Sequence, residues 1–242
     1  MSEIQSLARG LKILDLLAKS EAGLNIGQVA GALGIDKSSA LRSLQTLSAY
    51  GFTAKDSISF KYSLGFHIVS LSRAVLNRMP LREIARPYLI ELVDRTGECA
   101  HLGVLYKDHV LYVDQVESPA TLRVNTEVGQ TAPLHCTALG KAILAFSDCP
   151  TPTELQSFTK NTLIDTGMLQ KNLDKIQEQG YALDDEEFDL GVRCLAVPIF
   201  GFHKKLIGSI GISGPASRLT LQRLKDVSLI LLKAGIELSN QV

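Results

Sequence analysis

Apolar residues near the start of the chain recur at intervals of three and four positions, which is the spacing of one helical face. This pattern predicts a helix over residues 6–18 and a second, short helix over residues 27–33. Gly34 then allows a tight turn, and Asp36 is a suitable N-cap for a third helix that ends before Gly51. Three short helices with a glycine turn before the third are typical of a helix-turn-helix.

The pattern changes its period after the third helix. Residues 52–64 alternate around a polar turn at Asp56 and Ser57, which predicts a β-hairpin. A hairpin directly behind the third helix is a wing, and the two together indicate a DNA-binding domain over residues 1–65. The alternative is a winged module that contacts another protein.

Helical spacing returns over residues 65–79 and stops at Pro80, so we predict a linker helix within residues 66–80. The remainder, residues 81–242, forms a second domain in which helical and strand patterns alternate. Helices are predicted over 81–96, 137–146, 169–179 and 220–239, and strands over 99–106, 110–117, 122–126, 194–200 and 206–213. This order predicts an α+β fold in which helices cover an antiparallel sheet.

Charge limits the partners that the whole chain can attract. The sequence has 25 Lys and Arg against 25 Asp and Glu, so the net charge does not draw it to nucleic acid or to an anionic membrane. Residues 1–65 hold seven cations and five anions, which gives this part the sign that DNA binding needs. No apolar run approaches the ~20 residues of a membrane span, and we expect a cytoplasmic protein without a membrane partner.

The cysteines give no sign of a metal site. Cys99, Cys136, Cys149 and Cys194 form no C-x-x-C pair, so we expect reduced thiols and no zinc site or disulfide framework. The sequence also lacks a phosphate-binding loop and a dinucleotide fingerprint, so no cofactor is expected.

One face of the third helix carries cations and hydroxyls and no acid after its N-cap, which favours an anionic partner over plain solvation. Lys37, Ser38 and Ser39 lie at the helix start, where amides and the helix dipole favour phosphate. Arg42 is the best candidate for a bidentate contact to guanine, and Gln45 could read adenine. The wing adds two lysines to this surface: Lys55 and Lys61 flank its tip, within reach of phosphate or the minor groove.

Sequence segments from both domains resemble the IclR (isocitrate-lyase-regulator) family of transcription factors. The matching text at the front is SLARGLKILDLLA, LNIGQVAGALGIDKSSALRSLQTLSAYGF and YSLG. In the second domain it is LREIARPYLIELVDRTGE, HLGVLYKDHVLYVDQVES, PLHCTALGKAIL, GYALDDEEFDLGVRCLAVPIF and IGSIGISGPASRLT. The number and the order of these segments extend the resemblance over essentially the whole chain.

The resemblance implies a winged helix-turn-helix, a linker helix that helps the DNA-binding domains dimerise, and a GAF-like domain that binds a small metabolite. It implies double-stranded operator DNA and a small organic-acid effector as partners. It also implies a homodimer or a dimer of dimers that represses or activates a catabolic operon. Arg9 matches the arginine at the start of the family's first helix, where it could contact the DNA backbone.

The same resemblance assigns seven effector-binding positions. They are His135, Thr137, Ala138, Leu139, Asp184, Cys194 and Ser213. Amides at a helix start and the hydroxyls of Thr137 and Ser213 would supply donors to a carboxylate. Gly211 replaces a serine of the family pattern, so we expect one donor fewer and more room, which favours an acid larger than the smallest keto acids.

Three other readings of the second domain are open. A metal sensor could use His101, His135, Cys136 and Cys194 as ligands. An acyltransferase could use a thiol nucleophile with His135, Cys136, Asp184 and Cys194, although no nucleophile signature surrounds either cysteine and we expect no enzyme. A dimerisation platform would bind no ligand at all.

Overall fold

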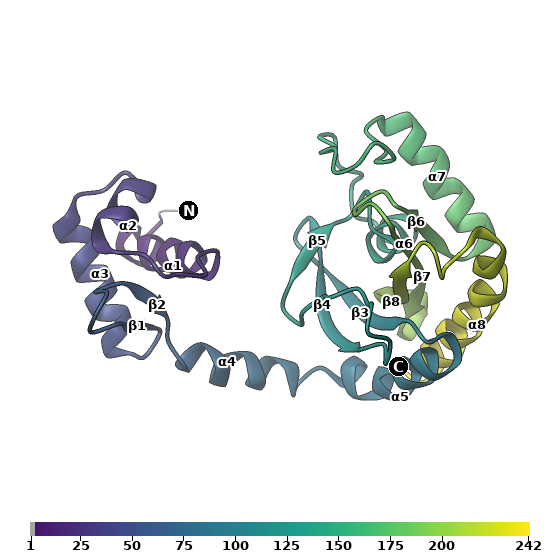
Figure 1. Cartoon of the computed structure of the whole chain (residues 1–242), viewed down its shortest axis with the longest axis horizontal. Coiled ribbons are helices and arrows are strands. Elements are labelled where there is room, and N and C mark those ends of the chain that lie inside the picture. Colours follow the sequence, from purple (N-terminus) through teal and green to yellow (C-terminus); the bar gives the residue numbers. More distant parts are fainter. Residues whose placement is uncertain (1–2) are drawn as a thin grey trace. The chain divides into compact units, whose positions relative to one another are not determined.

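The computed structural model describes residues 3–242, and the chain divides into two compact units after Arg78. The first unit contains α1 (Gln5–Ala18), α2 (Ile26–Leu33), α3 (Lys37–Ala49), β1 (Thr53–Lys55), β2 (Tyr62–Leu64) and α4 (His67–Leu76). The second contains α5 (Pro80–Thr96), β3 (Cys99–Tyr106), β4 (His109–Val116), β5 (Thr131–Pro133), α6 (Ala138–Phe146), α7 (Thr166–Gln179), β6 (Ala182–Asp185), β7 (Val192–Phe200), the short 3-10 turn η1 (Phe202–Lys204), β8 (Leu206–Pro215) and α8 (Leu221–Ser239). Figure 1 labels the helices and strands.

Local side-chain chemistry defines the ends of the helices in the first unit. The Asn25 side chain accepts a hydrogen bond from the Gln28 backbone amide, and the Gln28 side chain accepts one from the Asn25 backbone amide, which makes a capping box at the start of α2. Gly34 ends α2 with a φ of 63°, a conformation that glycine adopts without a steric penalty. Asp36 then caps α3 by accepting from the Ser39 amide at 2.8 Å.

The helices and the wing of the first unit share one small core. Its buried side chains come from α1, α2, α3 and β2: Ile13, Leu17, Val29, Ala30, Ala40, Leu44 and Tyr62. The predicted helix-turn-helix and wing are therefore present, with β1 and β2 paired antiparallel. The predicted linker contains α4, a helix with no buried residue.

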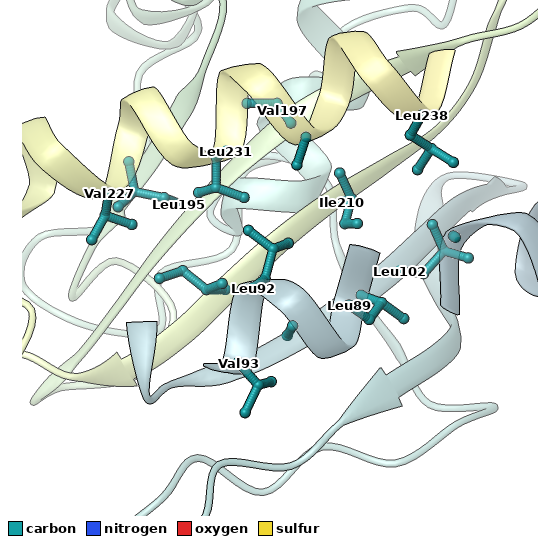
Figure 2. Packing of buried hydrophobic residues seen from close by; sticks show 14 of the residues in the cluster. Leu89, Leu92, Val93, Leu102, Leu195, Val197, Ile210, Val227, Leu231 and Leu238 are labelled. Atoms are coloured by element: carbon teal, nitrogen blue, oxygen red, sulfur yellow. The ribbon is translucent and has the colours of Figure 1, made fainter. Parts of the chain in front are cut away.

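The second unit is built on one antiparallel sheet of six strands in the order β5-β4-β3-β8-β7-β6. Helices α5 and α8 cover one face, and Figure 2 shows Leu89 and Leu92 of α5 in the same packed cluster as Leu231 of α8 and strand residues such as Val197. Helix α6 lies on the other face, where Leu139 and Ile143 pack with residues of α7. The predicted α+β class is confirmed.

One predicted strand is wrong and two strands are unpredicted. Residues 122–126 form an irregular segment, because their alternation finds no neighbouring strand with which to pair. The strand beside β4 is instead β5, only three residues long and ended by Pro133, too short for an alternating pattern. The other unpredicted strand is β6, which has four residues.

No helix within residues 3–242 is both long enough and apolar enough to cross a membrane.

Candidate functional site

A small cavity lies on the α6 side of the sheet in the second unit. Its walls come from all six strands of the sheet, from the start of α6, and from two irregular segments around residues 124–130 and 188–189. Its interior volume is ≈ 70 Å³, which is room for roughly five water-sized spheres. The unpredicted irregular segment after β4 therefore forms part of the wall.

Sheet register brings three of the predicted residues into one row on this face. Cys194 of β7 is the direct cross-strand partner of Ser213 on one side and of Asp184 on the other. Side chains at paired positions point to the same face of a sheet. Residues separated by up to 29 positions in the sequence thus become neighbours in the cavity wall.

The start of α6 supplies hydrogen-bond donors to the cavity. Thr137 is the N-cap: its Oγ1 accepts from the Gly140 amide at 3.2 Å and donates to the Pro133 carbonyl at 2.7 Å. This leaves the amides of Ala138 and Leu139, the first two of the helix, without an intrahelical acceptor. The helix dipole adds to the attraction of these amides for an anion. The Thr137 hydroxyl already donates its proton to the Pro133 carbonyl, so its expected role as a ligand donor would require this hydrogen bond to break.

A buried histidine connects the row to the irregular segment. His101 Nε2 is hydrogen-bonded to Ser213 Oγ, and its Nδ1 lies 3.0 Å from Thr126 Oγ1. Thr126 in turn donates to Gln115 Oε1 at 2.6 Å. Burial lowers the pKa of His101 to about 4, so the ring is neutral at physiological pH.

Asp184 is held by its own backbone surroundings. Its Oδ1 accepts from the amides of Glu187 at 2.8 Å and Phe188 at 3.4 Å. Burial nevertheless raises the pKa of the carboxyl to about 7, because the charged form loses its hydration. A carboxyl with this pKa can exchange its proton near neutral pH.

A buried ion pair lies next to the cavity. Lys141 of α6, with none of its surface exposed, contacts Glu187 of the segment that follows β6. The second carboxylate oxygen of Glu187 is buried without a hydrogen-bond partner in the described part of the chain. This pair links α6 to the segment that carries Phe188, a residue of the cavity wall.

Six of the seven predicted effector residues line the cavity: Thr137, Ala138, Leu139, Asp184, Cys194 and Ser213. His135 lies outside the wall, where its Nε2 is hydrogen-bonded to the Gln156 carbonyl at 2.9 Å and its ring is 6.2 Å from that of Phe158. The sequence reasoning missed several polar wall residues, among them His101 as an effector residue, Tyr112, Thr126 and Gln130. Contact of any of these residues with a ligand stays a prediction.

The expected gain of room at Gly211 is wrong. A Cβ atom on Gly211 would lie 2.3 Å from the Leu195 carbonyl and 2.9 Å from the Ala196 Cβ. Gly211 therefore marks a close approach of β8 to β7, and its missing side chain does not enlarge the cavity.

The buried thiols are poorly placed for nucleophilic or metal chemistry. Burial raises the pKa of Cys136 to about 12 and holds that of Cys194 well above its ordinary value, so both stay protonated. Within residues 3–242, no three His, Cys, Asp or Glu side chains are arranged to hold a metal ion.

The predicted DNA-binding residues border two surface hollows on either side of α3. Lys37 and Ser38 lie with Lys55 of the wing at one hollow. Arg42 lies with Arg9 of α1 at the other. Gln45 is exposed, and the helical repeat places it between these two sides.

Two serines at the start of α3 donate hydrogen bonds to Asp36, the N-cap of the helix. Ser38 Oγ donates to the Asp36 carboxylate, and the Ser39 amide does the same. Ser39 is also buried, so of the predicted phosphate contacts it is the least accessible. On the wing, Lys55 Nζ lies 5.2 Å from the centre of the Phe60 ring, while Lys61 is half-buried.

Comparison with known proteins agrees with this two-part structure. Residues 6–57 match the IclR helix-turn-helix domain, and residues 73–240 match the family described as bacterial transcriptional regulator IclR C-terminal. The chain is 33% identical to the HTH-type transcriptional regulator XynR of Escherichia coli, over 99% of this chain and 97% of XynR. It is 37% identical to BhcR of Paracoccus denitrificans, over 98% of this chain and 86% of BhcR.

A solved structure has the same fold along its full length. The IclR transcriptional regulator of Alicyclobacillus acidocaldarius superposes with a TM-score of 0.85 at 26% identity, covering 99% of both chains. The helix-turn-helix of the first unit and the curled sheet of the second thus occur together in this relative. We conclude that the chain belongs to the IclR family of DNA-binding bacterial transcriptional regulators.

Proposed function

We propose that this chain regulates a catabolic operon, and that a small organic acid bound in the cavity of the second unit sets its affinity for operator DNA. The observation that carries the proposal is the convergence of the Ala138 and Leu139 amides with the buried row at Ser213 in one cavity. Amides at a helix start bind carboxylates, and the cavity volume suits a small ligand.

The DNA half of the proposal uses the charged faces of α3 and the wing. Arg42 on the exposed face of α3 would read a base in the major groove. Lys37, Lys55 and Arg9 would hold the phosphate backbone on both sides of it. The regulator would work in the cytoplasm, where the operator is.

A homodimer, or a dimer of dimers, would place two such faces on one operator. The support for this part is apolar surface left uncovered on two helices of the first unit, α1 and α4. Leu7 and Leu11 of α1 are more than half exposed, and so are Val69 and Val75 of α4. Because α4 buries none of its residues in its own unit, a second copy could cover this surface.

The proposal includes no catalytic step. The thiols that an acyltransferase would need are held protonated by burial, as the raised pKa of Cys136 indicates. A metal-responsive mechanism is not favoured by any arrangement of ligands within residues 3–242.

The experiment is a thermal-shift screen of the full chain against keto, hydroxy, aromatic and sugar-derived acids. An acid at 100 times its dissociation constant adds about 2.7 kcal/mol to the stability of the unit that binds it. Ala138→Leu, which extends a side chain into the cavity, should abolish the shift, whereas Ala49→Leu on the exposed end of α3 should preserve it. A shift that survives in Ala138→Leu would place the binding site elsewhere and overturn the proposal.

A further inference from the structure

The hydrogen bonds in the cavity wall determine which atoms donate and which accept. Thr126 Oγ1 has one proton, and it donates this proton to Gln115 Oε1 at 2.6 Å. Toward His101 Nδ1, at 3.0 Å, Thr126 can therefore only accept. The proton of the neutral imidazole is thus on Nδ1, and Nε2 is left as an acceptor.

This tautomer fixes the role of Ser213. Because Nε2 of His101 is unprotonated, the hydrogen bond between the two residues uses the proton of the Ser213 hydroxyl. Only the lone pairs of Ser213 Oγ are then left for a ligand in the cavity. Ser213 is an acceptor for a ligand, the opposite of the donor role that the resemblance implies.

The two sides of the cavity are therefore of opposite polarity. The α6 side presents the free amides of Ala138 and Leu139, which are donors. At Ser213 Oγ the sheet side presents an acceptor. A ligand that satisfies both sides needs an anionic acceptor at one end and a hydroxyl proton at the other.

We propose that the effector of this regulator is a small hydroxy acid, with its carboxylate on the amides of Ala138 and Leu139 and its hydroxyl donating to Ser213. The inference rests on the proposed function and names the ligand class of the same cavity. A keto acid with the same carbon skeleton would place a carbonyl oxygen against the Ser213 lone pairs. Those lone pairs would receive no hydrogen bond from the keto acid, so the keto acid binds more weakly.

The volume of the cavity limits the size of this acid. A space of ≈ 70 Å³ holds roughly five water-sized spheres, so acids of two or three carbons fit without a change in the wall. Lactate and pyruvate are a matched pair of probes, since only the oxidation state of one carbon differs between them. Glycolate is a second, smaller hydroxy acid.

The test is calorimetric titration of the full chain with these three acids. In the wild type we expect lactate to bind about tenfold or more tightly than pyruvate. Gln115 does not line the cavity, so Gln115→Leu changes the wall only through the chain of hydrogen bonds. It frees the Thr126 proton for His101 Nδ1, allows the other tautomer, and should bring the affinity ratio toward unity. Gln115→Glu keeps an acceptor oxygen for Thr126 and should retain the wild-type ratio.

Each outcome separates this inference from the proposed function. Keto acids that bind as tightly as or more tightly than hydroxy acids overturn the inference and leave the acid-binding function intact. An affinity ratio that is the same in Gln115→Leu and the wild type also overturns it. If none of the three acids binds, the hydroxy-acid inference fails, and the wider acid screen decides whether the proposed function fails with it.

Discussion

Lys141 and Glu187 form an ion pair in the interior of the second unit, where the lysine is wholly buried and the glutamate is 7% exposed. The pair joins α6, whose first amides face the cavity, to the segment that follows β6. A buried charge is tolerated only while its partner is present.

Removing one member of this pair should therefore destabilise the second unit. Lys141→Met leaves Glu187 without its counter-charge, and we expect the free energy of unfolding to fall by about 3 kcal/mol. The double variant Lys141→Met/Glu187→Leu should recover most of this loss, because no unpaired charge is left inside. Urea unfolding of the second unit measures the free energy of unfolding of each variant. A double variant as unstable as the single one would contradict the claim that the unpaired charge causes the loss.

Asp184 should make stability depend on pH in a defined direction. The folded chain raises the pKa of this carboxyl from 3.8 to about 7, so its stabilising contribution is fully present below the unfolded pKa and is lost as pH rises through 7. Asp184→Asn has no such proton. Between about pH 5 and 7 the free energy of unfolding of the variant, relative to that of the wild type, should rise by about 1 kcal/mol per pH unit.

Unfolding free energies of both proteins across this pH range test the prediction. The titration of His101 is common to both and cancels in the difference. Parallel stability curves for the wild type and Asp184→Asn would mean that the folded chain does not shift the pKa of the carboxyl.

Restoring the family's serine at Gly211 should harm this chain. The new Cβ would lie 2.3 Å from the Leu195 carbonyl, and we expect Gly211→Ser to cost about 1–3 kcal/mol and to reduce the thermal shift by acids. The control is Gly31→Ser on α2, where a Cβ would meet nothing within 4 Å. If Gly211→Ser keeps the wild-type stability and binds acids more strongly, this prediction is wrong and position 211 has room for a serine side chain.

Arg42 and Lys55 should have different effects on DNA binding. Duplexes selected from a random pool by the full chain provide the probe. Arg42→Ala should lower affinity for the selected duplex by roughly 10–100-fold and relax the selected sequence. Lys55→Ala should weaken all duplexes alike and reduce the slope of log affinity against log salt by about one. Arg95→Ala, an exposed arginine of the second unit, should change neither.

Local patterns predicted the parts of the fold that depend on neighbours in sequence. Thr137 and the apolar residues behind it predicted α6, and alternating residues predicted β7 and β8 nearly to their ends. The alternation of residues 122–126 was misleading, because a strand needs a partner and none lies beside this segment. Short strands such as β6 contain too few residues to carry a period.

The cavity was predictable only in part. The family resemblance located the α6 side and the row at Ser213 by position. The hydrogen-bond chain through His101 joins residues 101, 115, 126 and 213, and no local pattern reports such a meeting. The resemblance assigns His135 to the wall, yet its side chain is hydrogen-bonded to the Gln156 carbonyl.

The most direct test of the central claim is the affinity of the full chain for a selected duplex with and without an acid that stabilises it. The account predicts that the acid changes the dissociation constant for DNA by roughly 5–150-fold, the usual range of coupling between two sites. It predicts no such change in Ala138→Leu, whose DNA affinity without acid should equal that of the wild type. An acid that binds the wild type and leaves its DNA affinity unaltered would contradict the claim that the cavity controls the DNA-binding unit.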